Sequence, residues 1–162
     1  MLPTAKNTNF LIFLGCASAI AVAYYMQYQM GLEPCPLCMT QRIFFIATGL
    51  VALIAFIHAK IGQHYKRYSA LNLLTSVTGG GFSMRQLYLQ SLPPEQAPAC
   101  GPGLGYMLEN FPFMQALEIM LKGDGNCAEV VWTLMGISIP GWTLIAFTGL
   151  AAISIWQLVR KN

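Results

Sequence analysis

The chain has 162 residues, of which 56% are hydrophobic and only 9% carry a formal charge. Soluble domains are about 45–50% apolar and about 25% charged, so nine basic and six acidic residues are too few to cover a water-facing surface of this size. Intrinsic disorder is excluded as well, because it requires low hydrophobicity and high net charge. The composition and length therefore indicate a single domain, residues 1–162, that lies in a lipid bilayer.

Four long stretches of the chain contain no formal charge, at residues 7–32, 43–59, 68–84 and 130–159. A membrane-spanning helix needs about 20 mostly apolar residues, with a usual range of about 17–25. We therefore predict an all-α membrane protein, a bundle of four transmembrane helices at residues 10–27, 42–59, 68–86 and 141–158. The third span is the least apolar, because it contains Asn72, Ser76 and three consecutive glycines. Small and polar residues are tolerated in a span that faces neighbouring helices.

The first span has the outline of a signal peptide, because Lys6 precedes an apolar run that contains Ala17-Ser18-Ala19. Cleavage there would leave three spans and would place one basic loop on the wrong side of the membrane. We therefore predict that this span is retained. It contains Cys16, which we interpret as a small buried hydrophobe.

The two signs of charge lie in different connections. Six basic residues lie at the N-terminus, in the 58–67 connection and at the C-terminus: Lys6, Lys60, Lys66, Arg67, Arg160 and Lys161. All acidic residues lie in the other two connections, 28–41 and 87–140: Glu33, Glu95, Glu109, Glu118, Asp124 and Glu129. Because Lys and Arg near span ends favour the cytoplasmic side, both termini and the 58–67 connection are predicted to be cytoplasmic. The connections 28–41 and 87–140 then face outward.

The second outward connection contains one further predicted helix, which begins after Pro112. Apolar residues recur there at helical spacing while polar residues take the opposite face: Phe113, Met114, Leu117, Met120 and Leu121 against Gln115, Glu118 and Lys122. We predict a short amphipathic helix that either lies flat in the headgroup region or packs on the bundle.

Four of the five cysteines lie in the outward connections, where disulfides persist. Cys35 and Cys38 form a Cys-x-x-Cys motif, and Cys100 and Cys127 lie in the second connection. A zinc site is disfavoured, because structural zinc sites prefer two closely spaced ligand pairs. Two disulfide staples or a redox relay remain. The spacing favours the relay, because a Cys-x-x-Cys disulfide closes too small a ring to be a good staple and the motif is typical of thiol exchange.

The position of Cys38, just before or in the first turn of the second span, also favours redox chemistry. The partial positive charge at a helix N-terminus favours a thiolate. Arg42 is four residues further on, so it shares a helix face with Cys38. Together they predict an electropositive pocket for a thiolate and a polar acceptor dissolved in lipid. Alternatively, Arg42 extends its charged group to the membrane–water interface and has no role in the site. The same two interpretations apply to Arg85, at the outer end of the third span.

These residues resemble the DsbB family, quinone-linked thiol oxidoreductases of the bacterial inner membrane. The resemblance covers nearly the whole chain and rests on several motifs in the outward connections and their borders: Cys35-Pro36-Leu37-Cys38 with Gln41-Arg42, Pro98-Ala99-Cys100-Gly101-Pro102, Gly123-Asp124-Gly125-Asn126-Cys127-Ala128-Glu129, Trp132 and Pro140-Gly141-Trp142.

The resemblance implies a path for two electrons through four catalytic cysteines. A reduced periplasmic DsbA-like thiol oxidase would form a mixed disulfide with Cys100, and Cys127 would exchange with Cys35. Cys38, as a thiolate, would reduce ubiquinone or menaquinone of the membrane pool beside Arg42. Arg85 resembles an arginine that only part of the family carries. The resting disulfides remain open: 35–38 with 100–127, or an interloop 35–127 bond.

Some neighbouring residues receive no such role. Gln41 is neutral, so we assign no carboxylate proton donor at that position. Met84, Gln86 and Tyr88 could line a quinone pocket, but we interpret them as ordinary residues of the membrane rim. We expect neither a metal ion nor a nucleic-acid partner.

The main alternative is a non-enzymatic four-span scaffold or channel whose outer loops are stapled by disulfides. The predicted spans contain no ionisable residue at mid-depth, which argues against ion conduction. A quinone reductase that resembles the vitamin K epoxide reductase group is a third possibility, but that group usually carries its Cys-x-x-Cys motif near the end of a late span.

Overall fold

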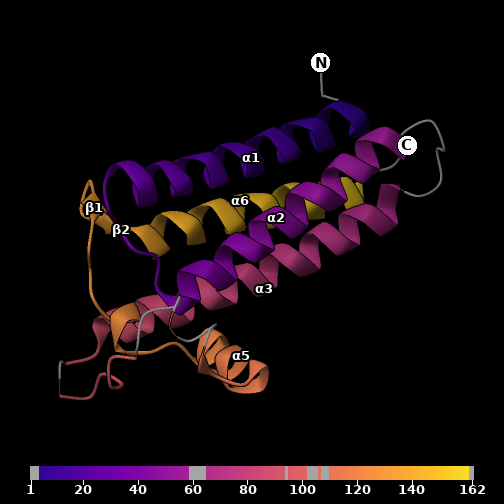
Figure 1. Cartoon of the computed structure of the whole chain (residues 1–162). Coiled ribbons are helices and arrows are strands. Elements are labelled where there is room, and N and C mark those ends of the chain that lie inside the picture. Colours follow the sequence, from indigo (N-terminus) through magenta and orange to yellow (C-terminus); the bar gives the residue numbers. More distant parts are fainter. Residues whose placement is uncertain (1–3, 59–64, 94, 102–105, 107–109, 161–162) are drawn as a thin grey trace.

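The structure is a computed structural model that describes residues 4–58, 65–93, 95–101, 106 and 110–160. Among these residues, four long helices run alternately in opposite directions (Figure 1): α1 Ala5–Gln29, α2 Pro36–Ile57, α3 Tyr65–Ser91 and α6 Ile139–Val159. Shorter elements lie between α3 and α6: α5 Phe113–Lys122, the 3₁₀ turn η2 Gly125–Cys127, and strands β1 Thr133–Leu134 and β2 Ile137–Ser138. The start of α1 and the end of α6 lie at the same end of the bundle.

The helices extend beyond the predicted spans, because a count of uncharged residues finds only the part of a helix that lipid tolerates. The difference matters most at α2, which begins at Pro36 rather than at residue 42. Proline suits the first turn of a helix, since its missing N–H has no partner to lose there. Cys35 is the N-cap, and its sulfur accepts a hydrogen bond from the backbone N–H of Cys38 at 3.4 Å. Cys38 therefore lies inside the first turn of α2.

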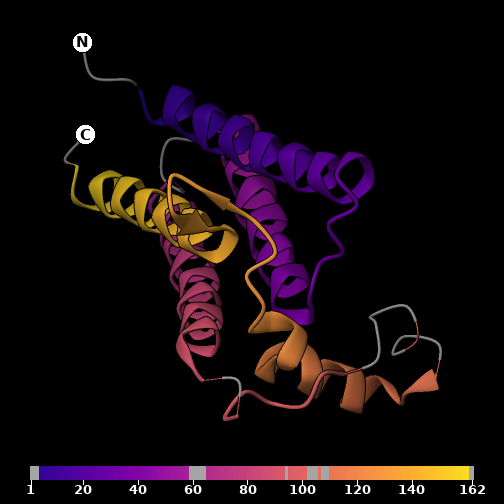
Figure 2. The ribbon, with the colours of Figure 1, turned by 90° about the vertical axis from the view of Figure 1, so that its left-hand side faces the viewer.

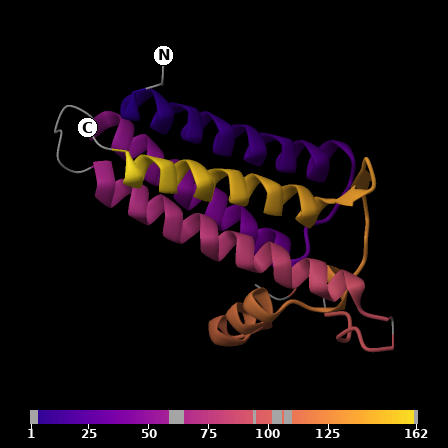
Figure 3. The same cartoon turned by 180° about the vertical axis from the view of Figure 1, so that it is seen from behind.

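The bundle is built from three main helix pairs. Helix α1 packs on α2, α2 on α3, and α3 on α6; in Figure 3 α1 and α3 lie on opposite sides of α6. The weaker pairing of α1 with α6 leaves an apolar groove of about 440 Å³ between them, lined by Leu11, Gly15, Phe45, Gly149 and Trp156 among others.

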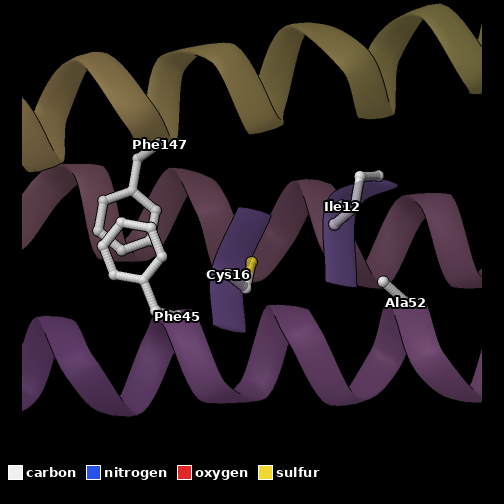
Figure 4. Packing of buried hydrophobic residues seen from close by; sticks show 5 residues of the cluster. All are labelled: Ile12, Cys16, Phe45, Ala52 and Phe147. Carbon is white, nitrogen blue, oxygen red and sulfur yellow. The ribbon is translucent and has the colours of Figure 1, made fainter. Parts of the chain in front are cut away.

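The core of the bundle is a cluster of five buried residues (Figure 4): Ile12, Cys16, Phe45, Ala52 and Phe147. The rings of Phe45 and Phe147 stack with their centroids 4.1 Å apart. Gly79 of α3 meets the Phe147 ring so closely that a Cβ on Gly79 would lie 2.5 Å from ring carbons. Cys16 is only 2% exposed, which confirms that it is a buried hydrophobe.

The protein is a mostly helical membrane protein. Within the described ranges, three helices are long and apolar enough to cross a membrane: α1, α2 and α6. Helix α3 has 27 residues, which is ample length, but it carries many polar side chains. Most of these face the interior, on a stripe of small and polar residues: Ser69, Asn72, Ser76, Gly79, Gly80, Ser83 and Gln86. The prediction of four spans is therefore correct only if α3 also crosses the membrane.

The segment between α3 and α6 forms a small layer at one end of the bundle. Figure 2, which views the bundle from that end, shows α5 and its neighbouring loops outside the four long helices. Helix α5 packs on α2, and its exposed Lys122 forms an ion pair with Glu118 one turn earlier. Strands β1 and β2 form an antiparallel hairpin with Thr133 opposite Ser138, a feature that the sequence analysis did not predict. Its turn places Met135 and Gly136 at positive φ.

Candidate active site

Three of the four predicted site cysteines meet at the N-terminal end of α2. The sulfurs of Cys35 and Cys38 are 3.1 Å apart. The thiol of Cys35 is also close enough to the sulfur of Cys127 to share its proton with it. Cys35 therefore lies between a cysteine of the helix and a cysteine of the second outer connection. All five cysteines of the chain are free thiols in this structure.

Apolar packing holds Cys127 in this position. Cys127 is completely buried and forms a cluster with Leu37 of α2 and Leu89 of α3. The chain reaches η2 through Gly123, whose φ of +79° favours glycine. A Cβ on Gly123 would also lie 2.7 Å from the side chain of Leu37. The connection can thus approach the start of α2 closely only with glycine at this position.

Hydrogen bonds favour negative charge on Cys127 rather than on Cys35. The pKa of Cys127 is lowered because its sulfur accepts a hydrogen bond from Cys35 and further ones from the backbone N–H groups of Leu37 and Asp124. The pKa of Cys35 is raised, because its proton is shared with Cys127 and Cys38 and because the thiol is buried. The N–H of Leu37 belongs to the first turn of α2, where a helix favours an anion.

Cys100 lies apart from this cluster, at the surface. Its segment is held against η2 by the backbone bond from Gly125 N–H to the carbonyl of Ala99, at 3.1 Å. A Cβ on Gly125 would lie 3.0 Å from the Cys100 sulfur, so only glycine permits this approach. The side chain of Asn126 adds a bond to the carbonyl of Gly101 at 3.1 Å. The exposed thiol of Cys100 is therefore held against η2, the turn that ends at the buried Cys127.

Gln86 is a site residue that the sequence analysis missed. It was interpreted as an ordinary rim residue together with Met84 and Tyr88, which are indeed 61% and 59% exposed. Gln86 is only 3% exposed, and its amide nitrogen lies 3.3 Å from the sulfurs of both Cys35 and Cys38. The interpretation was wrong for Gln86, because a residue one or two positions along a helix faces a different direction. The only feature of the sequence that pointed to Gln86 as a site residue was its position among the polar residues of the third predicted span.

Arg42 borders the same hollow as Cys38, on the side of α1. Its guanidinium donates hydrogen bonds to the side-chain oxygen of Gln27 and to the carbonyl of Ala23. It also lies over the ring of Tyr24, 5.4 Å from the ring centre. The hollow is lined further by Met26, Gln41, Phe45 and Thr143. The two residues that the sequence placed on one helix face therefore open into one space, and α1 holds the arginine there.

Arg85 makes its described contact elsewhere. Its Nε donates to the carbonyl oxygen of Lys122 at 2.8 Å, at the last residue of α5. A cation at a helix C-terminus satisfies an otherwise unpaired carbonyl and is favoured by the helix dipole. This contact joins α5 to α3, whereas Arg85 is not among the residues that line the hollow beside Cys38.

Comparison with known proteins identifies the family. The family model described as "Disulfide bond formation protein DsbB" matches residues 5–157, which include all four outer cysteines. The chain belongs to the DsbB family. A relative from Saccharophagus degradans, named Disulfide bond formation protein B, is 52% identical over 99% of this chain and 96% of its own length. Relatives of the same name from Hahella chejuensis and Marinobacter nauticus are 51% and 48% identical, over 98% and 93% of this chain and 96% and 90% of their own lengths.

Membership of the DsbB family assigns a broad role to the protein. The protein is a membrane protein of disulfide bond formation, and the family supports a disulfide oxidoreductase. This role agrees with the geometry, in which the exposed Cys100 lies apart from a cluster of the buried Cys127 and the partly buried Cys35 and Cys38.

Proposed function

We propose that the protein reoxidises a periplasmic DsbA-like thiol oxidase and passes two electrons to a membrane quinone. One observation carries the proposal: Cys35 is within reach of both Cys38 and Cys127. A sulfur in this position can exchange with a cysteine that serves an external partner and with a cysteine beside the membrane. A disulfide staple needs no third thiol at this place.

Thiol–disulfide exchange then gives a balanced sequence of steps. A thiolate of the partner attacks Cys100 of a Cys100–Cys127 disulfide, and Cys127 leaves as a thiolate. Cys127 attacks Cys35 of a Cys35–Cys38 disulfide, and Cys38 leaves as a thiolate. The second thiol of the partner displaces Cys100, which then displaces Cys35 from Cys127. One disulfide has been made in the partner, and Cys35 and Cys38 carry its two electrons.

Oxidation of this last pair completes the cycle. Cys38 thiolate and Cys35 thiol form their disulfide again, and the two electrons with two protons convert ubiquinone or menaquinone to the quinol. One proton comes from the Cys35 thiol and one from solvent. The net reaction is that the partner dithiol and a quinone give the partner disulfide and a quinol.

The hollow between Cys38 and Arg42 is the proposed quinone site. The N–H groups of Arg42 suit a carbonyl oxygen that gains negative charge on reduction. Phe45 lines both this hollow and the apolar groove between α1 and α6. The groove would accommodate the isoprenoid tail, which has no polar groups. A quinone-binding role for Arg85 has less support, because its contact with α5 accounts for it.

The redox energetics also favour a quinone. A DsbA-like oxidase has a reduction potential of about −120 mV, whereas glutathione buffers lie at about −180 mV or below. Glutathione would therefore reduce the partner instead of reoxidising it. The acceptor must be more oxidising, and the respiratory quinone pool is dissolved in the membrane in which this protein lies.

The proposal places the protein in the bacterial inner membrane with four spans and the cysteines on the periplasmic side. Helix α3 would be the fourth span, because its outward face is apolar even though its inward face is polar: Leu71, Leu74, Val77, Met84 and Tyr88 are all exposed. Lys6, Lys66 and Arg67 belong to the helix ends opposite the cysteines. This arrangement satisfies the rule that basic residues remain cytoplasmic. Lys60 and Lys161 lie outside the described residues.

A quinone reduction assay tests the proposed function. The purified protein is mixed with quinone and a reduced periplasmic thiol oxidase, and quinone absorbance is followed. Wild type should reduce quinone, and Cys38→Ala should abolish turnover. Arg42→Ala should raise the KM for quinone about tenfold or more, since a hydrogen bond to a charged group contributes about 1.5–3 kcal/mol. Arg85→Ala should leave this KM unchanged.

Two results would contradict the proposal. If wild type does not reduce quinone, or if turnover persists in Cys38→Ala, the two-electron path is wrong, and a scaffold with stapled loops is the better explanation. An unchanged KM in Arg42→Ala would remove the proposed quinone site while leaving the cysteine exchange intact.

A further inference from the structure

A chain of buried polar side chains connects three helices to the Cys35–Cys38 pair. It begins at Thr143 of α6, whose hydroxyl lies 2.6 Å from Oε1 of Gln41 in α2. Nε2 of Gln41 lies 2.7 Å from Oε1 of Gln86 in α3. Nε2 of Gln86 lies 3.3 Å from each of the two sulfurs. Gln41 and Gln86 are each only 3% exposed, so protein groups rather than bulk water surround this chain.

From Thr143 to Gln86 the chain has a direction. The Thr143 hydroxyl donates to the Gln41 oxygen, which leaves the Gln41 amide N–H groups to donate to the Gln86 oxygen. The Gln86 oxygen also accepts from the Cys38 thiol at 3.6 Å, a bond that ends when Cys38 becomes a thiolate, and the Gln86 amide presents its two N–H groups to the sulfurs. The side chain of Ser83 lies 3.0 Å from the Thr143 hydroxyl and adds a fourth member. The orientation of Gln86 is thus fixed from outside the site.

We propose that Gln86 is a catalytic hydrogen-bond donor to Cys35 and Cys38, and that Gln41 and Thr143 are positioning residues that hold its amide toward the sulfurs. This inference rests on the proposed function, in which Cys38 becomes a thiolate when Cys127 opens the Cys35–Cys38 disulfide. The Cys38 sulfur gains the negative charge at that moment, and one Gln86 N–H is already directed at it. The second N–H serves the sulfur of Cys35.

A neutral donor suits this position better than a second cation would. Cys38 already has Arg42 across the hollow that both residues line. The amide stabilises a developing charge through fixed dipoles, and such dipoles are most effective where water is excluded. The amide also remains compatible with the neutral disulfide, so it does not need to move or change protonation between the two states of the pair.

The test compares wild type with Gln86→Met, Gln86→Glu and Gln90→Met in the same quinone assay. Met matches the length of Gln but has no N–H. Glu keeps an oxygen for Gln41 but presents no amide N–H to the sulfurs. Gln90 is one turn further along α3, where it contacts Ser138 and the carbonyl of Glu129 instead of a cysteine. It is the matched control for loss of a polar group from α3.

We expect both Gln86 variants to lower kcat about tenfold or more, with the KM for quinone unchanged, while Gln90→Met behaves as wild type. The second readout is the equilibrium between the Cys35–Cys38 disulfide and a glutathione buffer. Loss of the donor disfavours the reduced pair, so the equilibrium constant for its reduction should fall about tenfold, corresponding to one hydrogen bond of about 1.4 kcal/mol. A purely structural role for Gln86 would not change this equilibrium in a folded variant.

The positioning role is tested by combination. Gln41→Met should lower kcat less than Gln86→Met, and it should have no further effect when added to Gln86→Met, because both changes then remove the same interaction. Additive losses would contradict the positioning role.

The outcomes separate this inference from the function on which it rests. If wild type fails to reduce quinone, the proposed function fails. If wild type is active and either folded Gln86 variant matches it in both kcat and the glutathione equilibrium, Gln86 is not a catalytic donor, even though the four-cysteine path stands.

Discussion

Hydrogen bonds at the start of α2 favour Cys127 as the nucleophile in its exchange with Cys35. In the reduced protein the Cys127 sulfur accepts hydrogen bonds from the Cys35 thiol and from the backbone N–H groups of Leu37 and Asp124, which lower the pKa of Cys127. When Cys35 is in the Cys35–Cys38 disulfide it has no proton to donate, and the two N–H groups still favour a thiolate at Cys127. Because the thiolate is the attacking species in exchange, this favours attack by Cys127 on Cys35, in agreement with the proposed flow of electrons.

This direction predicts a pH dependence. In the reduced protein with Cys16, Cys38 and Cys100 replaced by Ala, Cys127 should ionise below the ordinary range of a thiol. Its thiolate is present above the lowered pKa and is lost as the pH falls through it. Adding Cys35→Ala removes the donor and should raise the pKa of Cys127 toward its usual value. A titration followed by the ultraviolet absorbance of the thiolate measures the midpoint.

Cys35→Ser is the control for this titration, because its hydroxyl still donates a hydrogen bond. It should keep the pKa of Cys127 below that of the Ala variant. Equal midpoints with Cys, Ser and Ala at position 35 would show that the contact does not set the ionisation of Cys127.

Among the elements, α3 has the largest influence on the site. It carries Gln86 toward the cysteines and Leu89 against Cys127, and it packs on both α2 and α6. Close packing on α6 depends on Gly79, which faces the ring of Phe147. Small residues allow such close approach between helices in a membrane. In the glycine run of α3, Gly79 therefore has a packing role, whereas Gly81 has none.

A pair of substitutions tests this difference. Gly79→Ala would place a methyl group 2.5 Å from the Phe147 ring, and overpacking of this kind costs about 1–3 kcal/mol. Gly81→Ala meets nothing within 4 Å and replaces glycine by a better helix former, so stability should be unchanged or higher. Thermal unfolding in detergent, followed by helical circular dichroism, measures both. A Gly79→Ala protein as stable as Gly81→Ala would refute the packing argument.

For the whole molecule, the separation of charge predicts an orientation in the membrane that depends on α3. Helix α3 connects the end that carries Lys66 and Arg67 to the end that carries the cysteines. If α3 crosses the bilayer, the two ends lie on opposite sides. If α3 does not cross, both ends of this helix lie on the same side, and the basic residues no longer follow the rule for cytoplasmic loops.

Labelling in spheroplasts distinguishes these cases. In a variant whose native cysteines are replaced by Ala, we introduce either Gln96→Cys or Lys66→Cys and apply a membrane-impermeant maleimide. Gln96→Cys should react in intact spheroplasts, and Lys66→Cys should react only after lysis. Reaction of both in intact spheroplasts would exclude a fourth span in α3.

The sequence by itself determined the features that depend on local composition. Uncharged runs revealed α1, α2 and α6, and they placed Cys38 just before, or in, the first turn of the second span, although α2 begins at Pro36. The five-residue pattern after Pro112 predicted a helix where α5 lies. Its place at the membrane surface remains a prediction. These signals are carried by neighbouring residues, so they can be detected without knowledge of the fold.

Only the tertiary structure decided how Cys100 and Cys127 are placed and which way the polar residues of α3 face. The spacing alone does not distinguish the two cysteines, and only the family resemblance implied that Cys127 exchanges with Cys35. Packing on Leu37 and Leu89 buries Cys127 beside Cys35, whereas Cys100 is exposed. Likewise, Gln86 contacts the sulfurs while Arg85, the next residue along α3, contacts α5. The physical reason is that α3 has apolar residues on its exposed face and polar residues in the interior, which reverses the usual pattern. Its orientation is then fixed by partners distant in the chain.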